Sequence, residues 1–277
     1  MKRLFPALFT FVGMCLVAVP CRAQEPSPAS RFQIQFPSFI TSAEADQAPP
    51  IEAPKQGGVP VPKPTYANQN KQAFQPTPMS KVVLYGLQLT FYEHVMRVAT
   101  QDFTRQQLEG KFWPEYFESV RVPEQWADKD GWEVNYIGHA IHGGAFTRIW
   151  LDQREKAATS KTQYMKQIGR AFIYTTIFSL QYEIGPMSEA SIGNVGMNPD
   201  DVGWVDLVWT PVGSVLWTIG EDMIDKYALA WVEKHVPFMM AKAAARMILN
   251  PSRMLANVSQ NRSPWSRVRR DWNGNWR

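Results

Sequence analysis

Apolar residues recur at helical spacing along most of the chain that follows its Pro-rich N-terminal part. In the segment KVVLYGLQLTFYEHVMRVAT, for example, the spacing is three or four positions throughout one stripe, which is typical of a single face of an α-helix. The stripe consists of Val82, Tyr85, Leu89, Tyr92 and Met96.

The same periodicity predicts further helices, and neither a hairpin signal nor an alternation of strands and helices interrupts it. We therefore expect an all-α fold, a compact bundle of five or six helices. Pro114, Pro211 and Pro237 are expected to interrupt three of the helical segments, and Thr210 is a candidate N-cap for a helix that restarts at Pro211. Besides 81–100, the helical segments are expected at about 104–122, 130–156, 162–185, 204–227 and 228–249.

The composition divides the chain into four expected regions. Lys2 and Arg3 precede an apolar run. Cys21 and Ala23 then place small residues at the −3 and −1 positions of a signal-peptidase cleavage site. Cleavage after Ala23 is expected, whereas acylation of Cys21 or an uncleaved anchor would be alternatives. The regions are a signal peptide at 1–23, a Pro-rich disordered linker at 24–80, an α-helical domain at 81–249 and a basic Arg/Trp-rich tail at 250–277.

Cleavage would change both the cysteine content and the charge of the chain. Cys15 and Cys21 both lie in the expected signal peptide, so the mature chain would contain no thiol for a disulfide, for catalysis or for zinc. The net charge would fall from +4 to +1, and the tail alone carries six arginines against one acidic residue. The body is thus slightly acidic, which argues against nucleic acid as a partner.

The apolar runs of the body are too short, or too often interrupted by a charge, to indicate a membrane span. The helices are nevertheless apolar on more than one face, which leaves a buried core and a domain partly embedded in a bilayer as alternatives. In the tail, Trp265, Trp272 and Trp276 alternate with arginines, a composition that suits a membrane interface or a solubilising tail.

Polar residues inside the apolar helices are the candidates for a functional site. His139 and His142 differ by three positions and therefore share one helix face, where two imidazoles can bind one metal ion or act together on a substrate. Glu183 closes an apolar helix, where a carboxylate requires a partner. Each of these residues also has a purely structural interpretation, as a surface histidine pair or a salt bridge.

A further stripe follows Gly203, on a helix whose other faces are apolar. This stripe of acidic, hydroxyl and small residues would allow a neighbouring helix to approach closely and would place Asp206 on the inner side of its helix. Alternatively, the stripe would serve helix packing alone. No G-x-S-x-G, P-loop, Rossmann or H-E-x-x-H motif occurs, so no nucleotide partner is expected. The stripe consists of Asp206, Thr210, Gly213, Trp217, Gly220 and Glu221.

These motifs, in this order, resemble an uncharacterised family of bacterial envelope proteins that share a domain of unknown function. The likeness spans residues 131–265 and rests on a His-x-x-x-Gly motif, an acidic residue at a helix end, a D-x-x-x-T-x-x-G motif and an N-P-x-R run. It implies a shared site and an envelope location, but no reaction. A fainter likeness extends to VanZ-like helical membrane proteins. The matching residues are His139, Gly143, Glu183, Asp206, Thr210, Gly213, Gly220, Glu221, Asn250, Pro251 and Arg253.

The sequence thus predicts an exported protein, periplasmic or associated with an envelope membrane, that binds a ligand or a metal or acts as an interaction module. The sequence does not identify a cofactor; a divalent metal is one candidate, with His139, His142, Glu183 and Asp206 as candidate ligands. The alternative is a hydrolase of a lipid or envelope glycan, in which His139, Glu183 and Asp206 are catalytic. Additional candidates for ligand contacts are His142, Thr210, Glu221 and Arg253.

Overall fold

The computed structural model describes residues 74–267 apart from 121–125, 128–129 and 193–202. The expected signal peptide, nearly all of the expected linker and the end of the tail lie outside the described residues. Within them the fold is all-α, as predicted, and contains no strand. None of the described helices is long and apolar enough to cross a membrane.

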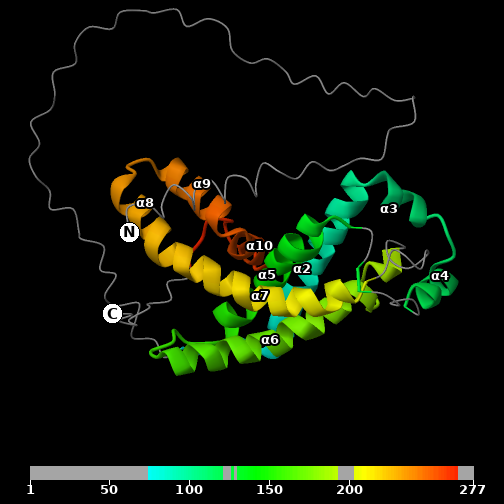
Figure 1. Cartoon of the computed structure of the whole chain (residues 1–277), viewed down its shortest axis with the longest axis horizontal. Coiled ribbons are helices and arrows are strands. Elements are labelled where there is room, and N and C mark those ends of the chain that lie inside the picture. The colour runs from blue at the N-terminus through cyan, green and yellow to red at the C-terminus, as the bar shows by residue number, and fades with distance from the viewer. Residues whose placement is uncertain (1–73, 121–125, 128–129, 193–202, 268–277) are drawn as a thin grey trace, which may run out of the picture. The chain divides into compact units, whose positions relative to one another are not determined.

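Three long helices form the centre of the domain (Figure 1). Helix α5 (His139–Arg154) packs against both α6 (Lys161–Ile184) and α7 (Trp204–Ile224), and α6 and α7 also contact each other. A π-helical turn, η2 (Glu133–Gly138), leads directly into α5. The three helices enclose a core that is unusually rich in polar side chains.

Helix α2 (Met79–Thr100) and helix α10 (Pro251–Ser259) cover another side of α5. Val82, Tyr85 and Leu89 of α2 are buried as predicted, and they pack in an apolar cluster with Phe146 and Phe178. The predicted stripe does not continue to Met96, which is exposed, because the buried positions of the second half of α2 are the polar residues Thr90 and His94.

Shorter helices complete the fold at the two ends of the long ones (Figure 1). At one end lie α3 (Asp102–Gln107) and α4 (Phe112–Ser119), and the hydroxyl of Tyr116 donates a hydrogen bond of 2.8 Å to the carbonyl of Ile184. At the other end, the π-helical turn η5 (Asp225–Leu229), α8 (Ala230–His235) and α9 (Met239–Leu249) lead from α7 to α10. The break between α8 and α9 falls at Pro237, as predicted.

Two features differ from the sequence prediction. Helix α7 continues through Pro211, and the hydroxyl of Thr210 contacts His139 instead of capping a new helix. Helix α10 begins after the boundary predicted at Leu249, so the packed domain extends at least to Ser259. The reason is tertiary, because α10 is short and polar and gains its burial from contact with α5.

Close contacts between the central helices depend on two adjacent glycines of α5. A Cβ atom at Gly143 would lie 2.3 Å from the carbonyl oxygen of Thr210, and one at Gly144 would lie 2.9 Å from the Cβ of Ser252. These two glycines are therefore sites of close helix packing. Gly220 differs from the prediction, because a Cβ at this position would meet open space.

Candidate functional site

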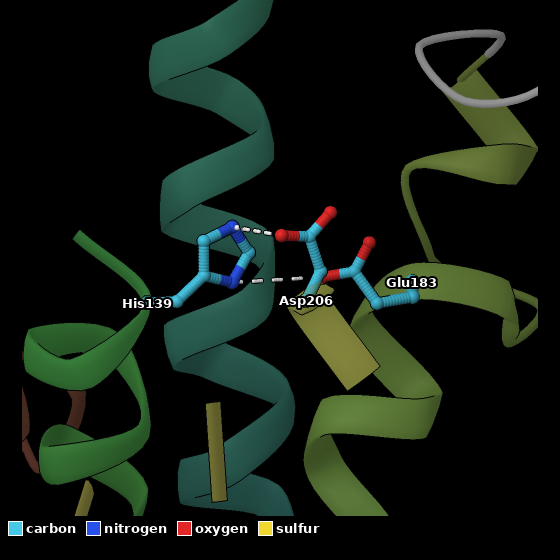
Figure 2. Close-up of side chains that lie close together, drawn as sticks. All are labelled: His139, Glu183 and Asp206. Carbon is cyan, nitrogen blue, oxygen red and sulfur yellow. Dashed lines mark ion pairs between the residues drawn. The ribbon is translucent and has the colours of Figure 1, made fainter. Parts of the chain in front are cut away.

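His139, Glu183 and Asp206 converge from three different helices, although they are far apart in the sequence (Figure 2). His139 is the first residue of α5, Glu183 lies in the last turn of α6 and Asp206 in the first turn of α7. All three side chains are buried, and one ligand atom of each lies within 4.8 Å of the others. The predicted association of these residues is therefore present in the fold.

The two carboxylates approach different nitrogens of the imidazole ring (Figure 2). The Nε2 of His139 lies 3.2 Å from Oδ1 of Asp206, and its Nδ1 lies 4.0 Å from Oε1 of Glu183. The same Nδ1 is 2.8 Å from the hydroxyl of Thr210. A hydrogen bond from Nδ1 to this hydroxyl would fix the ring and leave the lone pair of Nε2 on the side of Asp206.

Local structure explains why these side chains face inward. The π-helical turn η2 ends at Gly138, so the backbone changes its helical phase immediately before His139. Gly143, one turn further along α5, lets that helix approach the backbone of Thr210. Together the turn and the glycine bring the imidazole of His139 against the first two turns of α7.

An apolar cleft reaches this cluster at His139. The cleft has a volume of about 650 Å³ and lies among α2, α5, α6 and α10. His139 and His142 contribute to its wall together with Tyr182, and most of the remaining wall is apolar. The apolar lining residues include Leu89, Val95, Met96, Val134, Leu255 and Val258.

His142 does not join the three-residue cluster. Its Nδ1 lies 2.8 Å from the carboxylate of Glu93, and its Nε2 is buried without a hydrogen-bond partner. The ring packs against Tyr182 at a centroid distance of 4.3 Å, while the ring of His139 is 6.5 Å away. The structure thus divides the predicted His–His pair between two carboxylate partners.

A third histidine, His94, stacks on Tyr182 at a centroid distance of 4.8 Å. Burial lowers the pKa of His94 below its ordinary value, against the opposing effect of Glu189, and Arg97 lowers it further. Burial also raises the pKa of Tyr182 well above its usual range. Both aromatic side chains are therefore neutral at neutral pH.

The other predicted contact residues, Glu221 and Arg253, lie in a separate polar network around Arg148. Arg148 is fully buried, and its guanidinium contacts Asp222 at 2.6 Å, Glu221 at 3.3 Å and the carbonyl of Thr218 at 3.0 Å. Burial alone would raise the pKa of Asp222, but Arg148 and Arg253 outweigh this effect and hold it below its usual value.

The N-P-x-R run belongs to this Arg148 network and joins α10 to α7. Glu221 accepts hydrogen bonds from the backbone N–H of Ser252, at 2.9 Å, and from its hydroxyl, so this carboxylate caps the N-terminus of α10. Arg253 lies 3.5 Å from Asp222 and 3.6 Å from Asp225. These contacts explain the run by packing and charge pairing, without a ligand.

Some residues of these clusters were missed by sequence reasoning. Glu93 and Arg97 on α2 and Arg148 on α5 each interrupt an apolar helical stretch, which is the same signal that identified Glu183. Arg97 forms an ion pair of 2.5 Å with Glu189. A uniform search for charges within apolar helices would have found all of them.

Comparison of the chain with models of protein families, with curated proteins and with solved structures finds no match.

Proposed function

We propose that the helical domain binds a divalent metal ion through His139, Glu183 and Asp206. The observation that carries the proposal is the convergence of three buried ligand-type side chains from three helices. Two carboxylates and one imidazole are side chains that bind divalent transition metals, and here they lie together in a buried environment. A divalent cation would be held by one oxygen of each carboxylate and by one nitrogen of the imidazole.

The ligand set favours a transition metal such as zinc. Imidazole suits zinc, iron, nickel and copper, whereas calcium and magnesium prefer oxygen ligands alone. The ligands of one tetrahedral zinc ion lie roughly 3.3 Å apart, so side chains spread over 4.8 Å would have to rotate inward around the ion. Three protein ligands would leave a fourth position for water or substrate, as in catalytic zinc sites.

Metal analysis of purified protein tests the proposal. After incubation with zinc and dialysis, we expect about one equivalent of metal per wild-type chain. The substitutions His139→Ala and Asp206→Asn should each abolish retention of the metal, while the exposed His235→Ala should have no effect. Circular dichroism of each variant shows whether the helices remain. A folded wild type that retains none of zinc, manganese, iron or nickel contradicts the proposal.

A hydrolase is the second candidate function, and the apolar cleft beside His139 favours it. A metal-bound water, or water activated by the imidazole, would attack an ester or glycosidic bond of a ligand in the cleft. Mass spectrometry of lipid and glycan extracts incubated with the protein would detect the products. Hydrolysis that persists in the His139→Ala variant would assign the activity to another site or to a contaminant.

We also propose that the chain is exported to a bacterial envelope, as the N-terminal sequence and the resemblance to an envelope family suggest. Mass spectrometry of the protein from its native cells should find Gln24 at the N-terminus. A chain that retains Met1 in the soluble cell fraction would contradict export.

A further inference from the structure

Helices α6 and α7 expose apolar side chains and bury polar ones, the reverse of the usual arrangement. Helix α7 shows this inversion along its whole length, and its three acidic residues, Asp206, Glu221 and Asp222, are buried or paired within the domain. Its buried polar residues are Asp206, Thr210, Ser214, Thr218 and Glu221, and its exposed large apolar residues are Trp204, Val208, Val212, Leu216 and Met223.

Helix α6 also exposes apolar side chains in its second half, although this half buries Tyr174, Phe178 and Tyr182 beside its polar residues. Thr175, Ser179 and Glu183 face the interior, and no charged side chain of this half is exposed. Ile173 and Ile177 are 61% and 59% exposed, and Leu180 is 43% exposed. Such exposure is ordinary for a single residue, but a run of these residues along one helix indicates a surface that contacts something apolar.

Helices α6 and α7 are antiparallel neighbours, and their exposed apolar residues lie at the same positions along the helix axes. At one end the hydroxyl of Tyr164 donates a hydrogen bond of 2.8 Å to Asp222, and at the other end Glu183 and Asp206 meet at His139. The hydroxyl of Thr147 joins the midpoints, since it lies 2.9 Å from Thr175 and 3.3 Å from Ser214.

Ile173 and Ile177 are therefore level with Val212 and Leu216. The two rows lie on neighbouring helices at the same levels, and together we call them the α6–α7 face. It consists of Ile173, Ile177, Leu180, Val208, Val212 and Leu216.

The exposed charges at the Tyr164 end of this face have one sign. Among the described residues from 139 to 267, every Asp and Glu is buried or partly buried, and the exposed charged side chains are all basic. The exposed acidic residues lie between 102 and 133, where α4 contacts the other end of α6 through Tyr116. The exposed basic residues are Lys156, Lys161, Lys166, Arg170, Lys226 and Lys234.

This distribution favours an anionic partner over a second copy of the chain. Lys161 and Lys166 lie on the first half of α6, and Lys226 follows α7 directly at the same end. Two α6–α7 faces in contact would bring like charges together, whereas a bilayer with anionic lipids offers both apolar chains and negative phosphates.

We propose that the α6–α7 face docks on the surface of a lipid bilayer that contains anionic lipids. Its apolar side chains enter the boundary between headgroups and acyl chains, to a depth of about 5–10 Å. The lysines at the start of α6 and after α7 lie at the level of the phosphates. This inference is independent of the proposed metal site, because it involves none of the ligand residues.

Vesicle co-sedimentation tests the proposal. The full chain is mixed with phosphatidylcholine vesicles that contain or lack phosphatidylglycerol, and the bound fraction is measured in the pellet. We expect binding that is stronger to vesicles with phosphatidylglycerol. Ile177→Gln and Leu216→Gln should each weaken partition about tenfold, and together more than either alone. Replacing both Lys161 and Lys166 by Gln should remove the preference for phosphatidylglycerol.

Matched controls distinguish this face from other causes of binding. Leu108→Gln changes a leucine of similar exposure at the end of α3, and Lys111→Gln changes an exposed lysine before α4. Both should bind as wild type does, and every variant carries the same N-terminal residues, whose contribution to binding therefore cancels. Equal binding by wild type and the double Gln variant would overturn the proposal. So would a wild-type dimer that the double variant disrupts while neither protein binds vesicles.

Discussion

Two buried polar clusters hold α5 against α7, and they differ in the side chains that surround their carboxylates. The network around Arg148 pairs one guanidinium with Asp222 and Glu221, and the remaining oxygens of these carboxylates accept hydrogen bonds from Tyr164, Trp217 and Ser252. The cluster at His139 instead places two carboxylates around one imidazole, next to an apolar cleft.

The difference separates a structural role from a functional one. Charges that are fully paired inside a protein contribute to a specific packing and leave little capacity for a ligand. The cluster at His139 instead brings three ligand-type side chains together, and its position beside a cleft provides access. Residue type alone does not distinguish the clusters, because Glu221 and Glu183 are both buried glutamates on apolar helices.

The largest expected effect comes from breaking the matched network. Arg148→Met should lower the free energy of unfolding by about 3–5 kcal/mol, because Glu221 and Asp222 both lose the buried guanidinium that pairs with them. Denaturation with urea measures the loss. Arg170→Met is the control, since Arg170 pairs with Glu155 but is half exposed, and should cost about 1 kcal/mol or less. Similar losses in the two variants would show that the buried network is no more important than a surface pair.

The second prediction concerns the close approach of α5 to α7 beneath His139. Gly143→Ala should lower the free energy of unfolding by about 2–3 kcal/mol, because the added Cβ would lie 2.3 Å from the carbonyl of Thr210. Gly220→Ala on α7 adds the same methyl group in open space and should stabilise the helix by up to about 1 kcal/mol. Thermal unfolding gives the melting temperature of each variant, which should fall for Gly143→Ala and rise for Gly220→Ala.

The third prediction sharpens the functional side of the comparison. Zinc at about one hundred times its dissociation constant should stabilise the wild type by about 2.7 kcal/mol, because only the folded chain assembles the ligands. Asp206→Asn should remove this stabilisation, and Glu109→Gln, at an exposed glutamate, should not. Denaturation with zinc and with a chelator provides the measurement. Undiminished stabilisation of the Asp206→Asn variant would place the ion elsewhere.

The smallest effect is expected from the dependence of stability on pH, at His94, which stacks on Tyr182. Burial lowers the pKa of His94 from its ordinary value of 6.5, so the unfolded chain binds a proton at a higher pH than the folded one. Stability should therefore fall as the pH drops below 6.5, by at most about 1.4 kcal/mol per pH unit, until the folded pKa is passed.

His94→Phe would preserve the stacking on Tyr182 and should flatten this part of the pH profile. Urea denaturation between pH 5 and pH 7.5 gives the comparison, with the exposed His235→Gln variant as the control. An unchanged slope in His94→Phe would mean that groups other than His94 determine the pH dependence.

Sequence periodicity predicted the all-α class and most helix positions, because these depend on local spacing. It misjudged Pro211 and Met96, where the tertiary contacts override the local rule. At Pro211 the hydroxyl of Thr210 is engaged by His139, and around Met96 the helix buries Thr90 and His94 in place of apolar residues. The search for polar residues within apolar helices found His139, Glu183 and Asp206, but it could not show which of them meet.

By itself, the sequence determined the helical class and the candidate polar residues, because each of these is encoded by neighbours within a few turns. Only the tertiary structure decided that His139 meets Glu183 and Asp206, while Glu221 and Arg253 pair with other charges around Arg148 and His142 pairs with Glu93. Those partners come from separate helices, and the angle and level at which helices pack are set by the whole core and not by any local pattern.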